Sequence, residues 1–171
     1  MELPKIRGLA LDVDGVLTDG TFWWGPGGEE FKRFSFADIM GVSRACKAGV
    51  IVALISGEES PLIDRYAQKF ALKDIFQGCK DKAAALREFA GRRGLSLAEI
   101  CFMGDDVNDV AAMAIAGFSA APANAHPTAR EQAKLVTRHK GGKGAVRELV
   151  DLIVSRESRE ETLDPSRSAQ P

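Results

Sequence analysis

Three short apolar segments, each followed at once by small or acidic polar residues, constrain the fold of this chain most strongly. They cover residues 8–11, 50–55 and 100–103. Continuous apolar runs of this length are typical of strands buried on both faces of a parallel sheet. Segments with helical signals separate them, and this alternation predicts right-handed crossovers and an α/β fold with a doubly wound parallel sheet.

Two aspartates directly follow the first of these segments. Asp12 and Asp14 are two residues apart, so their side chains project the same way from an extended backbone. Adjacent carboxylates repel one another unless a cation lies between them, and Mg²⁺ prefers oxygen ligands of this kind. For an isolated pair, a polar strand end with two solvated acids is the competing interpretation, because short motifs often match by chance.

Polar residues follow the other two segments as well. Ser56-Gly57 comes after the second, and Gly104-Asp105-Asp106 comes after the third. Because ligands of open parallel sheets bind beyond the carboxyl ends of the strands, we expect one crevice to collect these residues. Lys82, at the start of a predicted helix, can reach the same crevice. Carboxylates hold Mg²⁺ while a hydroxyl and an ammonium hold phosphoryl oxygens, so the set predicts a metal and phosphate site.

A protruding β-hairpin is predicted at about residues 20–36. Gly25-Pro26-Gly27-Gly28 is a strong turn signal between two aromatic-rich segments. A small hairpin cannot bury that many aromatic side chains alone, so they either pack on the parent domain or form a subunit interface. Aromatic enrichment favours the interface. The residues are Phe22, Trp23, Trp24, Phe31, Phe34 and Phe36.

Helix signals complete the predicted domain, which spans residues 1–155. Asp38 is expected to cap a helix that ends near residue 48, and Ser60-Pro61 and Asp81 are expected to begin two more. A final amphipathic helix is expected over residues 143–155. Residues 156–171 are charged and lack periodicity, so we expect a mobile tail.

Composition excludes several classes of function. The net charge of −1 gives no electrostatic case for nucleic acid or an anionic membrane. We find no signal peptide and no run of the roughly 20 apolar residues that a membrane span needs. Cys46, Cys79 and Cys101 are odd in number and far apart, which is typical of reduced thiols. A cytoplasmic protein is therefore expected.

Taken together, four motifs resemble the haloacid dehalogenase (HAD) superfamily of phosphotransferases. The spacing between them leaves no room for an inserted cap domain. Over about residues 5–155 the chain resembles the capless branch that contains 3-deoxy-octulosonate (KDO) 8-phosphate phosphatase. The motifs are Asp12-Val13-Asp14-Gly15-Val16-Leu17-Thr18, Ser56, Lys82 and Gly104-Asp105-Asp106-Val107-Asn108-Asp109. The hairpin, Gln77-Gly78, Asp81-Lys82, Ala125-His126-Pro127 and residues 141–148 carry the likeness to the capless branch.

The resemblance implies a role for each aspartate of the first motif. Asp12 would be the nucleophile that accepts the phosphoryl group as an aspartyl phosphate. Asp14 would be the general acid for the leaving alcohol and then the base that activates water. The Asp12 and Asp105 carboxylates and the backbone carbonyl of Asp14 would ligate Mg²⁺.

The other motifs would bind phosphate and orient these groups. By the same resemblance, Ser56, Gly57 and Lys82 would hold phosphoryl oxygens. Asp106 and Asp109 would orient Lys82 and a metal-bound water without contacting the substrate themselves. For Asp109 a simple helix cap is an equal alternative.

The substrate is less clearly indicated, because the expected arginines are missing. Ala37, Ser43, Glu58 and Tyr66 stand where KDO 8-phosphate enzymes carry arginines, which clamp a carboxylate in a bidentate manner. Glu58 and Lys69 resemble relatives that act on nine-carbon keto-deoxy sugar 9-phosphates. Tyr66 and a lower positive charge would suit an aryl phosphate, as in the small subunit of phenylphosphate carboxylase. Glu58, Tyr66 and Lys69 are thus candidate substrate contacts.

The resemblance also implies a homotetramer in which the hairpins meet, with a small phosphate ester as substrate. A receiver-like phosphorylation module would use the same Asp, Mg²⁺, hydroxyl and Lys on a doubly wound sheet. The position of Asp14, two residues after Asp12, and the late position of Gly104-Asp105-Asp106 argue against that alternative. A non-catalytic subunit of a larger complex remains a third interpretation.

Overall fold

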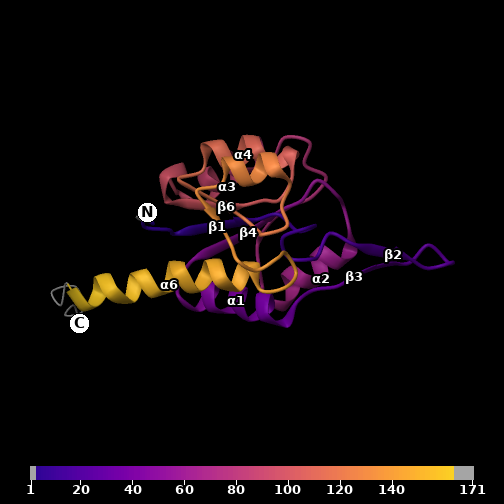
Figure 1. Ribbon diagram of the computed structural model, residues 1–171, viewed down its shortest axis with the longest axis horizontal. Helices are drawn as coiled ribbons and strands as arrows, with labels where there is room; N and C mark the ends of the chain where they lie inside the picture. The colour runs from indigo at the N-terminus through magenta and orange to yellow at the C-terminus, as the bar shows by residue number, and fades with distance from the viewer. Residues whose placement is uncertain (1–2, 164–171) are drawn as a thin grey trace.

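A six-stranded parallel sheet forms the centre of the protein, in a computed structural model that describes residues 3–163 (Figure 1). The strand order is β5-β4-β1-β6-β7-β8, and every neighbouring pair is parallel. The predicted doubly wound sheet is therefore confirmed. The strands are β1 Gly8–Leu11, β4 Ile51–Ile55, β5 Asp74–Phe76, β6 Ile100–Met103, β7 Phe118–Ala121 and β8 Leu135–Val136.

The central strand β1 sets the position of the site. All four of its residues are buried. Leu11, the last residue of β1, is level with Leu54 of β4 and Met103 of β6. Parallel strands that end level with one another release their following residues at the same edge of the sheet. The polar residues after these three strands therefore start from one place.

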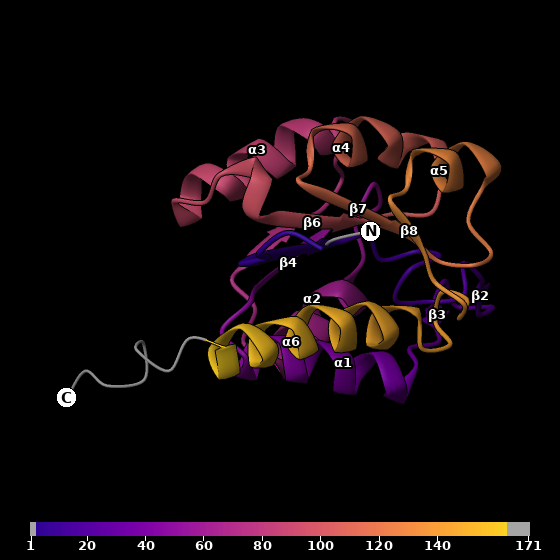
Figure 2. The ribbon, with the colours of Figure 1, turned by 60° about the vertical axis from the view of Figure 1, so that its left-hand side comes forward.

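Helices cover both faces of the sheet (Figure 2). Each helical layer closes its own hydrophobic core against the sheet. One layer contains α1 Phe36–Lys47, α2 Pro61–Lys69 and α6 Ala145–Leu163. The other contains α3 Lys82–Arg93, α4 Val110–Ile115 and α5 Pro127–Gln132. Two short 3-10 helices, Leu97–Glu99 and Val107–Asp109, precede β6 and α4.

The predicted hairpin is present and protrudes from the domain (Figure 1). Its antiparallel strands are β2 Phe22–Trp24 and β3 Glu30–Lys32. The aromatic side chains on both strands are exposed to solvent, and Trp24 has the largest exposed fraction among them, 73%. Phe34 differs, because its ring lies 4.8 Å from that of Tyr66 and packs against the core. Phe36 was expected in the hairpin but is the first residue of α1.

Asp38 does not cap its own helix, which corrects the sequence prediction. Helix α1 begins after Ser35, and Asp38 lies in its first turn with no exposed surface. Its carboxylate instead accepts the backbone N–H groups of Gly144 and Arg147, at 3.0 and 3.1 Å. Asp38 therefore satisfies the free N–H groups at the start of α6 and joins the two helices.

The C-terminal helix is longer than predicted. α6 continues to Leu163, eight residues past the expected end at residue 155. The added segment, residues 156–163, contains neither Gly nor Pro, so nothing in it breaks the helix. The rest of the predicted mobile tail, residues 164–171, lies outside the described residues. No helix within residues 3–163 is long and apolar enough to cross a membrane.

Candidate active site

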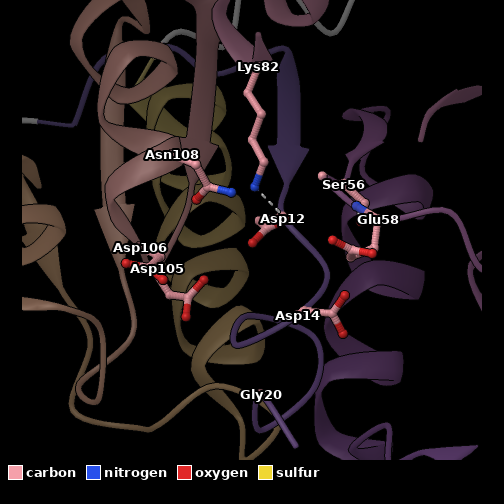
Figure 3. A pocket seen from close by; sticks show the side chains of 10 residues that line it. Asp12, Asp14, Gly20, Ser56, Glu58, Lys82, Asp105, Asp106 and Asn108 are labelled. Carbon is pink, nitrogen blue, oxygen red and sulfur yellow. Dashed lines mark hydrogen bonds and ion pairs between the residues drawn. The ribbon is translucent and has the colours of Figure 1, made fainter. Parts of the chain in front are cut away.

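A pocket of about 250 Å³ opens beyond the carboxyl ends of β1, β4 and β6 (Figure 3). It brings together most of the residues that the motifs predict. Five of its ten lining residues are acidic, and Lys82 is the one cation among the ten. The lining residues are Asp12, Asp14, Gly20, Ser56, Gly57, Glu58, Lys82, Asp105, Asp106 and Asn108.

Lys82 joins two buried carboxylates, that of Asp12 in the wall of the pocket and that of Asp109 behind it. Its Nζ lies 2.9 Å from Asp12 Oδ1 and 2.6 Å from Asp109 Oδ1. All three residues are at least 95% buried. Burial would lower the pKa of Lys82, but the charges of Asp12 and Asp109 outweigh it and raise that pKa above its ordinary value. The lysine is therefore an ammonium that holds the Asp12 carboxylate in one orientation.

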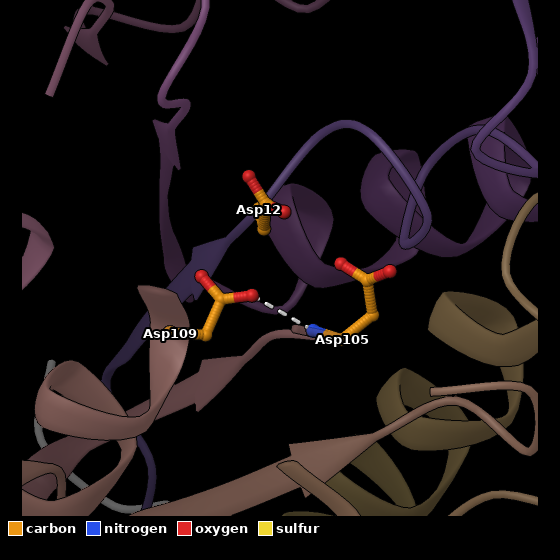
Figure 4. A group of neighbouring side chains, drawn as sticks. All are labelled: Asp12, Asp105 and Asp109. Carbon is orange, nitrogen blue, oxygen red and sulfur yellow. Dashed lines mark hydrogen bonds between the residues drawn. The ribbon is translucent and has the colours of Figure 1, made fainter. Parts of the chain in front are cut away.

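Asp109 organises the loop after β6. Its Oδ2 accepts the backbone N–H of Asp105 over 2.9 Å (Figure 4). The same oxygen accepts the backbone N–H of Asp106 over 3.1 Å, while Oδ1 binds Lys82. A side-chain carbon on Gly104 would lie 2.4 Å from Asp109 Cβ, so only glycine fits there. Asp109 thus orients Lys82 and also completes a capping box with Asp106. The contact with Lys82 and the capping role are thus both present, and the predicted contact with a metal-bound water stays a prediction.

Asp12 and Asp105 lie close enough to share a cation. One carboxylate oxygen from each, and one from Asp109, lie within 4.8 Å of one another. Burial and the nearby Asp109 raise the pKa of Asp12 well above its usual range, and the same two causes raise that of Asp105 to about 6. Since both Asp109 oxygens are already engaged, Asp12 and Asp105 are the pair whose charges a metal ion would balance.

Gly15 makes room for Asp105. Its φ of +92° is a conformation that side chains disfavour, and an added Cβ would lie 1.9 Å from Asp105 Oδ2. The chain can therefore pass directly over this carboxylate only because residue 15 is glycine. This close approach brings the loop after β1 and the loop after β6 together.

Asp14 is paired with a lysine that the sequence analysis did not identify. Lys32 of β3 donates a hydrogen bond from Nζ to Asp14 Oδ2 over 2.9 Å. The sequence does contain a signal for it. Glu30 and Lys32 alternate with the exposed Phe31, so the two charged side chains share the other face of the strand.

The turn at residues 56–58 lines the pocket across from Asp106 and Asn108 (Figure 3). Ser56 is 1% exposed, and its Oγ accepts the backbone N–H of Glu58 over 3.1 Å. Glu58 is exposed and lines the pocket, and its contact with substrate stays a prediction. Across from it Asn108 also lines the pocket. Asn108 belongs to the last motif but was given no role, because its direction cannot be read from spacing alone.

Tyr66 and Lys69 are not among the lining residues, although both were candidate substrate contacts. Tyr66 is 5% exposed and lies on the buried face of α2, with its ring between those of Phe34 and Phe70. It is a core residue, and the prediction that it contacts substrate in this pocket is corrected. Lys69 is exposed on the last turn of the same helix.

A family model described as haloacid dehalogenase-like hydrolase matches residues 29–149. The chain belongs to this family. This HAD-like hydrolase is 39% identical over 150 residues to the 3-deoxy-D-manno-octulosonate 8-phosphate phosphatase of Yersinia pestis, covering 88% of this chain and 80% of the relative. The corresponding Escherichia coli K12 enzyme is 37% identical over the same length and shares. The HAD-like hydrolase is thus a phosphatase of this family, as the motifs predict.

Solved structures agree with these sequence matches. The Yersinia pestis phosphatase superposes with a TM-score of 0.88 at 38% identity, covering 91% of this HAD-like hydrolase and 84% of that chain. The phosphatase of Moraxella catarrhalis was solved with magnesium, phosphate and KDO. It superposes with a TM-score of 0.86 at 33% identity, covering 93% of this chain and 94% of that chain. The cobalt-bound form of the Haemophilus influenzae deoxy-D-mannose-octulosonate 8-phosphate phosphatase superposes with a TM-score of 0.87 at 32% identity, covering 95% of each chain.

Proposed function

We propose that this HAD-like hydrolase cleaves a phosphomonoester through an aspartyl phosphate on Asp12, with Mg²⁺ as cofactor. The observation that carries the proposal is the placement of Asp12. Its carboxylate lies in the pocket, is held by the Lys82 ammonium at 2.9 Å, and is next to Asp105. A buried carboxylate that is oriented by a cation and open to a pocket is arranged as a nucleophile.

The metal site is proposed on this chain's own donors. The carboxylates of Asp12 and Asp105 and the backbone carbonyl of Asp14 would hold Mg²⁺, a hard cation that prefers oxygen ligands. The raised pKa values of Asp12 and Asp105 agree with this assignment, because they reflect burial first and the nearby charge of Asp109 second, and a bound cation would offset both. When bound, the metal would neutralise charge on the phosphoryl group.

The remaining chemistry belongs to the side chains of the pocket. In the first step Asp12 attacks phosphorus and the ester P–O bond breaks, while Asp14 in its acid form gives a proton to the leaving oxygen. In the second step the Asp14 carboxylate takes a proton from water as that water attacks phosphorus and the Asp12–phosphorus bond breaks. Lys82, the Ser56 hydroxyl and the Gly57 backbone hold the phosphoryl oxygens.

We propose a keto-deoxy sugar acid phosphate as substrate, of the KDO 8-phosphate or nine-carbon 9-phosphate type. The KDO 8-phosphate phosphatases that match most of the chain support the class. Glu58 at the edge of the pocket favours the nine-carbon type, and Lys69 agrees with it in sequence.

An aryl phosphate, as handled by a phenylphosphate carboxylase-type subunit, is the second candidate. It is favoured by the charges of the pocket. Lys82 is the one cation among the ten lining residues and already binds two carboxylates, so a substrate carboxylate finds no further positive charge in that set.

A homotetramer and a cytoplasmic location remain part of the proposal. The hairpin supports assembly, because exposed aromatic patches of this kind mark protein contacts. Phe22, Trp23, Trp24 and Phe31 are each 47% exposed or more. Light scattering coupled to size-exclusion chromatography measures the assembly directly, and a monomer would contradict it.

The test of function is phosphate release from a panel of esters with Mg²⁺. The panel contains eight- and nine-carbon sugar acid phosphates, simple sugar phosphates and aryl phosphates, with Asp12→Asn as the control variant. Turnover of a sugar acid phosphate that is lost in Asp12→Asn and with chelator supports the main proposal. Activity confined to aryl esters supports the second candidate. No turnover of any ester would contradict both and favour a non-catalytic subunit.

A further inference from the structure

The hairpin places a lysine with a covered side chain next to Asp14, which lines the pocket. Lys32 lies next to the exposed Phe31, yet its own side chain is only 3% exposed. Its Nζ donates to Asp14 Oδ2 over 2.9 Å and lies 3.5 Å from Glu30 Oε1. Lysine is seldom buried to this extent unless it is paired. The two acids therefore hold the ammonium at one defined position.

Contacts at both ends of β3 brace this position against the domain. Glu30 Oε1 accepts a hydrogen bond from Ser60 Oγ over 3.1 Å, and Ser60 is the N-cap residue of α2. On the other side, Arg33 forms an ion pair with Asp19 in the loop that follows the catalytic aspartates. Lys32 thus stands on the anchored base of the hairpin and not on its tip.

We propose that Lys32 is a positioning residue for the acid/base carboxyl of Asp14. Lys32 holds Oδ2, which leaves Oδ1 to exchange protons in the pocket. Asp14 lines the pocket and Lys32 is not among the lining residues, so the lysine acts through Asp14 and not on substrate. The inference rests on the proposed aspartyl-phosphate mechanism, in which Asp14 protonates the leaving oxygen and later deprotonates water.

The experiment compares Lys32→Met with the wild-type enzyme on two esters. One is the best alkyl phosphate from the panel, whose leaving oxygen needs a proton. The other is 4-nitrophenyl phosphate, whose leaving group departs as a stable anion. General acid catalysis contributes about 10²–10⁴-fold, so we expect kcat/KM for the alkyl ester to fall about 30-fold or more. For the aryl ester it should change less than about threefold, because that step hardly needs the acid.

A second readout follows the water step. Asp14 also activates water, so Lys32→Met should release a burst of nitrophenolate equal to the enzyme concentration, followed by slow turnover. Adding Lys32→Met to Asp14→Asn should cause no further loss in kcat/KM for the alkyl ester, since residues that act as a unit are not additive. Lys32→Arg, which keeps the charge, should recover part of the alkyl ester activity. Lys47→Met, at an exposed position on α1, is the matched control and should behave as wild type.

Several results would overturn the inference. These are an equal loss on both esters, an additive loss in the Asp14→Asn background, or full activity of Lys32→Met. Should Lys32→Met fail to fold by circular dichroism, Glu30→Gln removes the charge of the second acid that holds the Lys32 ammonium in place, without a new apolar side chain, and should show the same preference between esters. A wild-type enzyme that cleaves neither ester would instead refute the proposed function, so the two failures are distinguishable.

Discussion

The two aspartates after β1 lie in contrasting surroundings. Asp12 is 5% exposed, and its cation, Lys82, comes from the first turn of α3 within the same layered domain. Asp14 is partly exposed, and its cation, Lys32, comes from the protruding hairpin. The proposed nucleophile is therefore held by the sheet and its helices, whereas the proposed acid/base depends on a separate element being correctly docked.

This contrast matches the burial of the two pairs. Lys82, Asp12 and Asp109 form a group at least 95% buried, in which each removed partner leaves a buried charge at the base of the pocket. The Asp14–Lys32 pair has one face toward solvent, since the Asp14 side chain is 31% exposed. Changes on the Asp12 side should thus affect folding and activity together, and changes on the hairpin side should affect activity or assembly more than folding.

The largest effect is expected from Lys82→Met, which removes the cation that pairs with Asp12 and Asp109. Removing one partner of a buried pair typically costs 3–5 kcal/mol, so we expect the free energy of unfolding to fall by about that amount. Activity should be lost as well. Urea denaturation monitored by circular dichroism measures the change, with Lys47→Met as control. A loss below about 1 kcal/mol, as for a surface pair, would contradict this role of the buried group.

Gly15→Ala tests the same comparison, because Gly15 is where the loop after β1 packs against Asp105 in the loop after β6. The new Cβ would lie 1.9 Å from Asp105 Oδ2, so Asp105 must move and we expect Mg²⁺ affinity, measured as half-activation of turnover, to fall about 10–100-fold.

Gly94→Ala is the matched control for this change. Gly94 also has a positive φ, of +60°, but nothing lies within 4 Å of its added Cβ. It should lose stability by about 1 kcal/mol while its metal activation stays unchanged. Equal metal activation in both variants would contradict the proposed role of Asp105.

The pH dependence of metal binding tests the Asp12 side without mutation. The raised pKa of Asp105, about 6 against an ordinary 3.8, means that the metal-free folded state holds an extra proton between these values. Its stability should therefore fall as pH rises through this window. Metal binding needs the ionised carboxylates and should strengthen over the same range. The gain in Tm on replacing EDTA with Mg²⁺ should then be larger at pH 7 than at pH 5, and an equal gain would contradict the assignment.

The smallest effect on the folded domain is expected from Trp24→Ser on the hairpin. Trp24 is 73% exposed, so the free energy of unfolding of the single chain should change by no more than about 0.5 kcal/mol. If the hairpins form the proposed interface, light scattering should show a smaller assembly. Leu152→Ser, at an exposed apolar position on α6, is the control and should leave the assembly intact. An unchanged mass for both variants would place the interface elsewhere.

Much of the site could be predicted from local signals. Asp12, Ser56 and Asp105 each follow an apolar strand, and the parallel sheet collects strand ends at one edge. Lys82 follows a helix cap at Asp81, which the structure confirms. In these cases each residue's position depends on the element next to it in the chain, so pattern and spacing were sufficient.

Other features depend on which surfaces meet, and only the tertiary structure decided them. Asp38 caps a helix that begins more than 100 residues later, and Lys32 reaches Asp14 from another element. Tyr66, expected at the substrate site, lies in the core because α2 turns that face toward Phe34. The sequence by itself determined the alternation of strands and helices and the residues at the strand ends, because periodicity and capping act over a few residues. The partners of side chains on α1, α2 and the hairpin were decided by packing between distant segments, which local patterns do not encode.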